Sequence, residues 1–274
     1  MHRLSGLYRS IVPWHGATAW ALVSSSIVFL STWYSHGFNS GVRGGIAVFI
    51  AWAIVRELAP RRFWPSLLAP FATTPFAIPA DTDLLACVGV LFAVRISART
   101  TGSAITTLDS MVLAIVVWLM VVHAPGLPIA LVLSAAVFAA RPRGIRMRLT
   151  GIVLLAAALV TGVLEGTVTP RPELIELNEA KVVLSVLCAV AAVWLCVAPL
   201  PRRLSVRDDR DARHLRGSAL RAGRVVAVCC LLAVLVWCGS PAPFLLSSLS
   251  GALVASAIGG ARARDASASG TLRA

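Results

Sequence analysis

Residues 202–239 read RRLSVRDDRDARHLRGSALRAGRVVAVCCLLAVLVWCG. Eight arginines are crowded into its polar part, 202–224, and an apolar run follows as far as residue 239. This order is typical of the junction between a cytoplasmic loop and a membrane-spanning helix, because basic residues resist translocation across a membrane. The stretch therefore predicts a helix that enters the membrane from the cytoplasmic side.

The same kind of apolar run recurs along the whole chain. A helix needs about 20 apolar residues to cross a bilayer, with a range of roughly 17 to 25. The sequence predicts an all-α polytopic membrane bundle, a single transmembrane domain over 1–260. Its ten expected spans lie near 16–35, 42–58, 64–80, 83–99, 105–123, 126–140, 149–167, 181–200, 223–239 and 242–260.

The basic residues alternate strictly between the two sides of these spans. If the N-terminus is cytoplasmic, the pieces outside hold only Arg43, Arg171 and Lys181 of the 25 basic residues. The other 22 lie inside: Arg3, Arg9, Arg56, Arg61, Arg62, Arg95, Arg99, Arg141, Arg143, Arg146, Arg148, the eight arginines of 202–224, Arg262, Arg264 and Arg273. This bias predicts a multi-pass plasma-membrane protein with both termini and the Arg-rich loop 201–222 in the cytoplasm.

The number of spans is less firmly set than their direction. The run 64–80 contains four prolines, which remove backbone donors and break or kink a helix: Pro65, Pro70, Pro75 and Pro79. If 64–99 is a re-entrant pair, eight spans remain and every other loop keeps its side. Outside the membrane, the acidic stretch 165–181 predicts a short surface helix at 172–180. The tail 261–274 is expected to be disordered.

Composition narrows the classes of protein. The chain is 58% hydrophobic and 14% charged, with a mean hydropathy of +0.83, whereas soluble domains have about 25% charged residues. The net charge of +13 lies in short loops between apolar runs, so we expect contact with anionic lipid headgroups and not with nucleic acid. The six cysteines lie within apolar runs, no CxxC or HxxxH spacing occurs, and we expect no metal and no cofactor.

One polar cluster is a candidate binding site at the cytoplasmic side. Charges within spans are expensive and are functional candidates by default. Arginine can hold a phosphate or an anionic headgroup through two hydrogen bonds. We expect Arg95, Arg99 and Asp109 to meet in space. The cluster comprises Arg56, Glu57, Arg95, Arg99, Thr100, Thr101 and Asp109.

Structural roles for the same residues remain open. Asp109 fits a helix cap together with Thr106, the arginines could extend to the interface, and Glu57 could pair with Arg61 one turn away. Glu165 is a separate candidate for binding a proton, a cation or a substrate, or is an ordinary interfacial carboxylate. No residue is identified as catalytic.

The last span carries a ridge of small residues, Gly251, Ala255 and Gly259, at intervals of four. Such a ridge permits close approach of a second helix. It predicts close packing inside the chain, and a homodimer or another membrane-protein partner is the alternative.

Arg56-Glu57-Leu58-Ala59-Pro60, Arg95-x-x-x-Arg99-Thr100-Thr101-Gly102 and Leu108-Asp109 together resemble a pattern in uncharacterised polytopic membrane proteins of high-GC actinobacteria. The resemblance covers about residues 50–110, and the Ala-rich composition with arginine in place of lysine agrees with it. It implies no activity and no catalytic residues. In length and topology alone, the chain is similar to the drug/metabolite transporter superfamily.

Three functions follow as expectations. The first is a small carrier or permease for a metabolite or lipid-like molecule, because nearly the whole chain is span. The second is a membrane-embedded enzyme acting on a lipid-linked or phosphorylated substrate at the cytoplasmic face. The third is a non-catalytic subunit of a membrane complex. A carrier needs polar residues that converge near mid-bilayer, and an enzyme needs the cluster at 56–109 in a pocket open to the cytoplasm.

Overall fold

A computed structural model describes residues 16–60, 63–78, 82–98, 107–122, 126–139, 179–197, 203–207, 214–238 and 242–271, with isolated helical residues at 153, 156–157 and 160. The expected seventh span, 149–167, therefore lies almost wholly outside the described residues. The expected surface helix at 172–180 also lies outside them, except for its last two residues.

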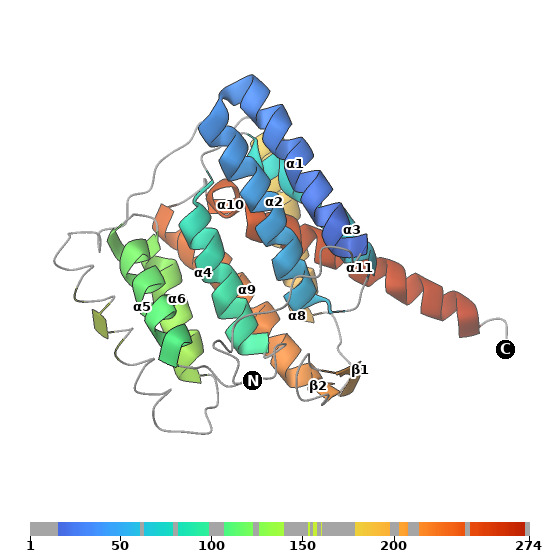
Figure 1. Cartoon of the computed structure of the whole chain (residues 1–274). Coiled ribbons are helices and arrows are strands. Elements are labelled where there is room, and N and C mark those ends of the chain that lie inside the picture. Colours follow the sequence, from blue (N-terminus) through green and yellow to red (C-terminus); the bar gives the residue numbers. More distant parts are fainter. Residues whose placement is uncertain are drawn as a thin grey trace.

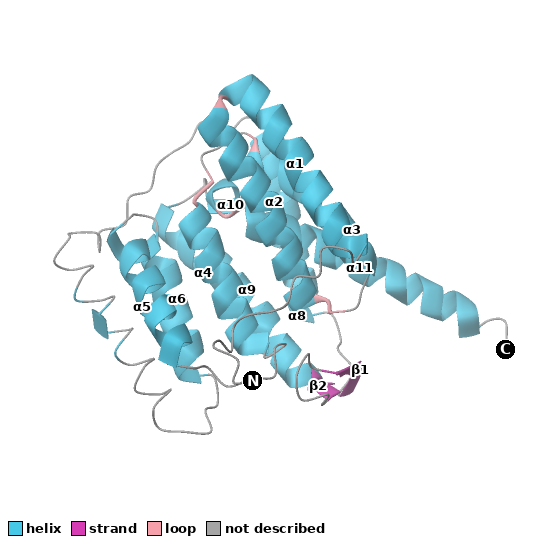
Figure 2. Cartoon of the chain, in the orientation of Figure 1, coloured by secondary structure: helices cyan, strands magenta, loops and turns pink. Residues whose placement is uncertain are grey.

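The described chain is helical apart from one short hairpin, which confirms the all-α class (Figures 1 and 2). Helices occupy nine of the ten expected apolar runs. Their bounds are α1 Gly16–His36, α2 Phe38–Leu58, α3 Phe63–Ala77, α4 Leu84–Ala98, α5 Thr107–Val122, α6 Gly126–Ala139, α8 Glu179–Val197, α9 Gly217–Cys238, α10 Ala242–Leu245 and α11 Ser247–Thr271.

Three segments differ from expectation. The Arg-rich loop 201–222 contains an antiparallel hairpin, β1 Arg203–Arg207 and β2 His214–Arg216, and α9 already begins at Gly217. The run 242–260 is divided between α10 and α11. Finally, α11 continues to Thr271 and projects from the bundle, where a disordered tail from 261 was expected (Figure 1).

Two described helices are long and apolar enough to cross a membrane, α2 and α9. The apolar segments of α4, α5, α6, α8 and α11 are shorter, with 10–17 residues each. At about 1.5 Å per residue, the 15 residues of α4 extend roughly 22 Å, short of a hydrocarbon core of about 30 Å. Composition and length therefore single out two helices as candidate spans within the described chain.

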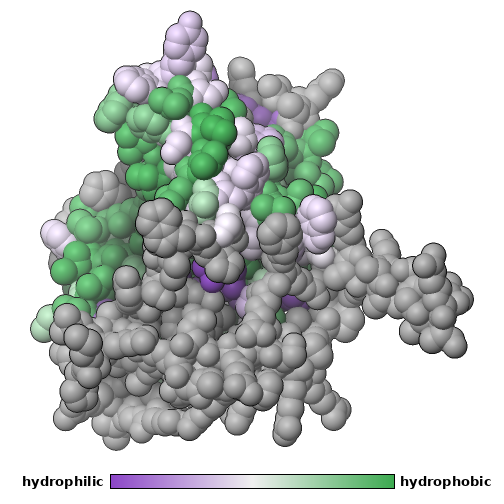
Figure 3. Space-filling model, turned by 45° about the vertical axis from the view of Figure 1, so that its right-hand side comes forward, coloured by the Kyte–Doolittle hydropathy of each residue, from purple (hydrophilic) through white to green (hydrophobic). Residues whose placement is uncertain are grey.

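The described surface exposes many large apolar side chains, and the interior is mainly apolar as well. Large apolar side chains are exposed in helical stripes, as on α8 at Val183, Val186, Val190, Val193 and Val197. In Figure 3, hydrophobic side chains cover much of the described surface. Contiguous apolar patches of this kind mark contact with lipid or with protein partners. The interior also holds many hydroxyl groups among its apolar residues.

The prolines of α3 were expected to break or kink the helix, and they do not break it. The α-helix runs through Pro70 and Pro75. Two threonine hydroxyls inside it donate to carbonyls one turn earlier, Thr73 Oγ1 to Ala69 O at 2.7 Å and Thr74 Oγ1 to Pro70 O at 2.9 Å. Local hydroxyl bonds of this kind help proline-containing helices persist in apolar surroundings.

The small-residue ridge of α11 packs against α3 inside the chain. A Cβ added at Gly251 would lie 2.6 Å from Thr73 Cα, and one at Gly259 would lie 2.6 Å from Pro65 Cδ. The two backbones approach closely because neither glycine has a side chain. The ridge is therefore occupied by an intramolecular neighbour at two of its positions.

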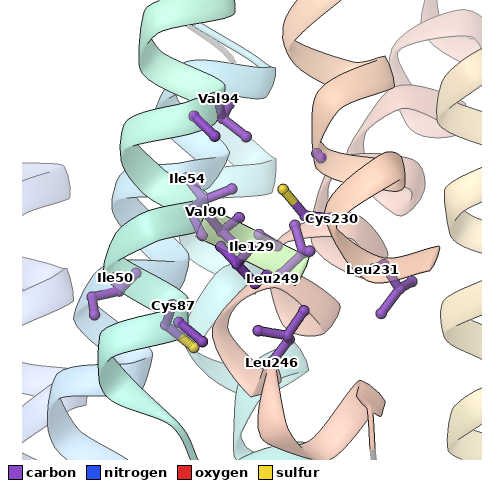
Figure 4. Packing of buried hydrophobic residues seen from close by; sticks show 14 of the residues in the cluster. Ile50, Ile54, Cys87, Val90, Val94, Ile129, Cys230, Leu231, Leu246 and Leu249 are labelled. Atoms are coloured by element: carbon purple, nitrogen blue, oxygen red, sulfur yellow. The ribbon is translucent and has the colours of Figure 1, made fainter. Parts of the chain in front are cut away.

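The apolar core joins helices distant in sequence. Val90 and Val94 of α4 lie beside Ile54 of α2, and Cys230 of α9 faces them, in the close view of Figure 4. Leu246 and Leu249, around the junction of α10 and α11, belong to the same buried cluster. This packing places the α10–α11 junction in the interior of the bundle, against α4.

Candidate functional site

The helical hydrogen-bond pattern changes around Leu246, the single turn residue between α10 and α11. Leu246 itself keeps a helical bond on each side, from its N–H to Ala242 O at 3.0 Å and from Ser250 N–H to its own carbonyl at 2.9 Å. Around the interruption, backbone carbonyls accept hydrogen bonds from outside the regular helix pattern. Leu245 O accepts from the backbone N–H of Asp83 at 3.1 Å, and Pro243 O accepts from Ser250 Oγ at 2.8 Å. The two carbonyls that leave the helical pattern here are therefore satisfied by other groups of the chain, the Asp83 N–H and the Ser250 hydroxyl.

Four hydroxyl residues surround the interruption and are all buried; we call them the hydroxyl cluster. They are Thr82, Ser247, Ser248 and Ser250. Thr82 Oγ1 and Ser247 Oγ lie 2.9 Å apart and share a hydrogen bond. Ser248 Oγ donates to Ala47 O of α2 at 2.8 Å. The cluster therefore connects α10 and α11 to α2 and to the start of α4.

The position of Ala47 gives the depth of the hydroxyl cluster. Ala47 lies near the middle of α2, which is one of the two helices long enough to cross a bilayer. Ser248 is therefore level with the middle of α2, whereas Thr82, which precedes α4, places the same cluster at the start of that helix. Polar groups converge here, away from both ends of α2.

A second polar layer lies at one end of the bundle, where α2, α4 and α8 end and α5 and α9 begin (Figure 1). We call this the charged end. Here Arg95 Nε of α4 donates to Glu57 Oε1 of α2 at 2.9 Å. The Glu57 side chain is fully buried and that of Arg95 is 12% exposed. A buried carboxylate is stable only when a cation and hydrogen bonds compensate its lost hydration, and Arg95 supplies both.

Other charged groups are buried at the charged end. Arg224 of α9 donates from a guanidinium nitrogen to Leu195 O of α8 at 3.3 Å. Its neighbour Gly223 packs on Ala98, since a Cβ there would lie 2.8 Å from Ala98 Cβ. Asp109, in the first turn of α5, is also buried.

The expected cluster is thus partly assembled by the fold. Glu57 and Arg95 are brought together, 38 residues apart in sequence. Arg56 instead lies over the ring of Trp52, 5.0 Å from its centroid, on its own helix. Asp109 is buried and does not face the exterior, but its meeting with Arg95 and Arg99 stays a prediction. Arg99, Thr100, Thr101 and Glu165 lie outside the described residues.

Sequence reasoning missed two components. Arg224 was counted only as part of the basic loop, yet it is buried in α9. The last span was interpreted only as a ridge of small residues for packing, and hydroxyl bonds from its serines were not expected. The signal available was the density of serine after Pro241 and Pro243, which predicts an interruption followed by hydroxyls that can bond to backbone.

The chemistry of the described residues is that of hydrogen bonding and ion pairing. Among them, no three His, Cys, Asp or Glu side chains gather as a metal site. The buried polar atoms without a hydrogen-bond partner within the described chain include Trp52 Nε1, Ser256 Oγ and, on α1, Ser25 Oγ. Measured along α2 and α11, the first two lie between the hydroxyl cluster and the charged end.

Comparisons with protein families, with characterised proteins and with solved structures gave no match to this chain. The features of the chain that bear on function are therefore the hydroxyl cluster, the charged end and the apolar surface.

Proposed function

We propose that the protein is a small carrier in the plasma membrane that moves a metabolite or lipid-like molecule. In this proposal the bundle crosses the membrane about ten times, and both termini and the charged end are cytoplasmic. The observation that carries it is the interruption between α10 and α11, with the hydroxyl cluster beside the middle of α2. Carriers bind their solutes near mid-bilayer, at interrupted helices. In this proposal the solute exchanges hydrogen bonds with the serine hydroxyls, which bind backbone carbonyls in the structure.

Two further observations support a carrier over an enzyme at the cytoplasmic face. The charges that an enzyme would use, Glu57 and Arg95, bind each other in a nearly closed environment. The buried Trp52 and Ser256 have polar atoms without a partner among the described residues. An unsatisfied buried donor costs about 1–3 kcal/mol, and a solute that accepts a hydrogen bond there would recover that energy.

The exposed apolar stripes support membrane embedding. Val236 of α9 is 79% exposed and belongs to a stripe with Leu232 and Val225. In water such a stripe would favour aggregation, whereas lipid solvates it without cost. A non-catalytic subunit would also have such stripes, so the experiment must test access to the hydroxyl cluster itself.

Labelling of a Ser248→Cys variant from both sides of the membrane tests the carrier directly. The six native cysteines are replaced, and a membrane-impermeant maleimide is applied to right-side-out and to inverted vesicles. Tyr34→Cys, at the highly exposed end of α1, is the positive control for the outer side. Val236→Cys, in a lipid-facing stripe, is the negative control.

A carrier exposes its central site alternately to the two sides, so we expect Ser248→Cys to react from both. Reaction from the cytoplasmic side alone would favour the enzyme and contradict the carrier. No reaction from either side, with Tyr34→Cys reactive, would identify the hydroxyl cluster as ordinary packing and would also contradict the carrier.

A further inference from the structure

We propose that the Glu57–Arg95 ion pair is the cytoplasmic gate of this carrier. The inference rests on the proposed function and assigns to two named residues the closure of the path below the hydroxyl cluster. It begins with the helices that the pair joins. Arg95 Nε and Glu57 Oε1 are 2.9 Å apart and connect α4 to α2.

The same two helices carry the contacts of the α10–α11 junction. Ser248 Oγ binds Ala47 O of α2, and Leu245 O accepts from Asp83 N–H at the start of α4. Cys87 Sγ also lies 3.8 Å from Leu245 O. The junction and the ion pair therefore bridge α2 and α4 at two levels of the bundle.

The vertical separation of these levels is given by the helix rise. Ala47 and Glu57 are ten residues apart on α2, which is about 15 Å at 1.5 Å per residue. Cys87 and Arg95 are eight residues apart on α4, which is about 12 Å. The ion pair thus lies at the charged end, about 12–15 Å along the helices from the hydroxyl cluster.

The exposed fractions of the two side chains place the pair at the edge of the interior. Glu57 is fully buried, while Arg95 retains 12% exposure, so the pair lies where the closed interior meets the outside. Separating α2 from α4 at this level would open the hydroxyl cluster toward the charged end, and it must break the pair. A solute passing between the helices can therefore do so only in a state in which Glu57 and Arg95 are apart.

An ion pair is well suited to this role because it is strong when closed and can be exchanged for hydration when open. The two charges attract strongly only while water is excluded, and water that enters on opening compensates both. The apolar contacts of α2 with α4 above it, such as Ile54 with Val90, do not depend on this pair.

The gate is tested by the rate at which maleimide labels Ser248→Cys from the cytoplasmic side of inverted vesicles. Glu57→Gln removes the charge and keeps the shape of the side chain, so we expect the labelling rate to rise about tenfold. This corresponds to a closed state that is about 1.4 kcal/mol less stable relative to the open state. The rate from the outer side should stay within twofold. Glu57→Asp keeps the charge and should give a smaller rise. The exchanged pair Glu57→Arg with Arg95→Glu should return the rate to near the parent value.

A matched control removes a charge from the other end of the same helix. Arg43→Gln, near the start of α2, should leave the cytoplasmic rate unchanged. Labelling of Tyr34→Cys and the amount of protein in the membrane check the fold of every variant. An equal rise from both sides in Glu57→Gln would indicate general loosening and would overturn the gate.

The gate and the carrier fail in different ways. If the parent is labelled from both sides and Glu57→Gln changes neither rate, the gate is wrong and the carrier stands. If Ser248→Cys is unreactive from both sides in the parent and in Glu57→Gln, the carrier is wrong, and the gate is wrong with it.

Discussion

Replacing Gly251 with alanine should destabilise the protein, because the added methyl group meets backbone. The new Cβ would lie 2.6 Å from Thr73 Cα and closer still to Thr73 Oγ1, so α3 and α11 must separate. Forcing an extra carbon into a packed core costs about 1–3 kcal/mol, and a contact with backbone belongs at the upper end. Alanine recovers about 1 kcal/mol of helix propensity. The net loss is therefore about 1–2 kcal/mol.

Gly89 in α4 provides the matched control. A Cβ there would lie 2.5 Å from Met120 Cε, the far end of a flexible side chain that can rotate away. Gly89→Ala gains the same helix propensity of about 1 kcal/mol. Moving the buried Met120 and contacting Ile129 Cγ2 at 3.1 Å offsets at least half of that gain, so we expect a net change within about 0.5 kcal/mol.

The assay is thermal unfolding of the detergent-purified variants. At about 2–4 °C per kcal/mol, Gly251→Ala should lower Tm by roughly 2–8 °C, and Gly89→Ala should shift it by at most about 2 °C. The predicted difference arises because the new methyl group meets backbone in Gly251→Ala and a flexible side chain in Gly89→Ala. Equal Tm shifts in the two variants would contradict this explanation. An unchanged Tm for Gly251→Ala would show that α3 and α11 do not approach as closely as described.

Three other predictions concern charge, lipid and the outer surface. Glu57→Gln should cost about 1–3 kcal/mol of unfolding free energy because it removes the carboxylate that pairs with the partly buried Arg95. Glu57→Leu with Arg95→Leu should cost less, and equal losses would contradict a buried pair. Val190→Asp, at a 60% exposed position of α8, should cost about 2.5–3.5 kcal/mol and reduce membrane insertion if that face meets lipid; an effect below about 0.5 kcal/mol would indicate that it meets water. In the expected surface helix, cysteine at Glu176 should be labelled faster than cysteine at Leu174, and equal labelling would indicate a plain loop.

The helices themselves were predictable because apolar runs and basic loops are local signals. The ends of α1 and α4, for example, lie within one residue of the expected runs 16–35 and 83–99. The start of α9 was placed six residues late, because Arg221 and the residues before it were counted as part of the loop 201–222. Helical propensity of arginine and burial of Arg224 outweigh that polar signal.

The interruption at Leu246 was not predicted, because it depends on contacts that are distant in sequence. Leu245 O is satisfied by Asp83 N–H, 162 residues earlier, and Ser248 Oγ by Ala47 O. Pairing of Glu57 with Arg95 has the same origin: the sequence offered Arg61 as a nearby partner, and only the packing of α2 on α4 selects Arg95. Charge and periodicity determine which residues are expensive to bury, whereas tertiary contacts determine their partners.

The most direct test of a membrane bundle with a cytoplasmic charged end is its sidedness. A reporter active only in the cytoplasm and a second active only outside are fused after Arg210, in the Arg-rich loop, and after Glu176, in the acidic stretch. The basic-residue bias and the placement of α9 and α8 predict that Arg210 reports inside and Glu176 outside. Both sites reporting from the same side would contradict the topology, and with it the assignment of the Glu57–Arg95 pair to the cytoplasmic face.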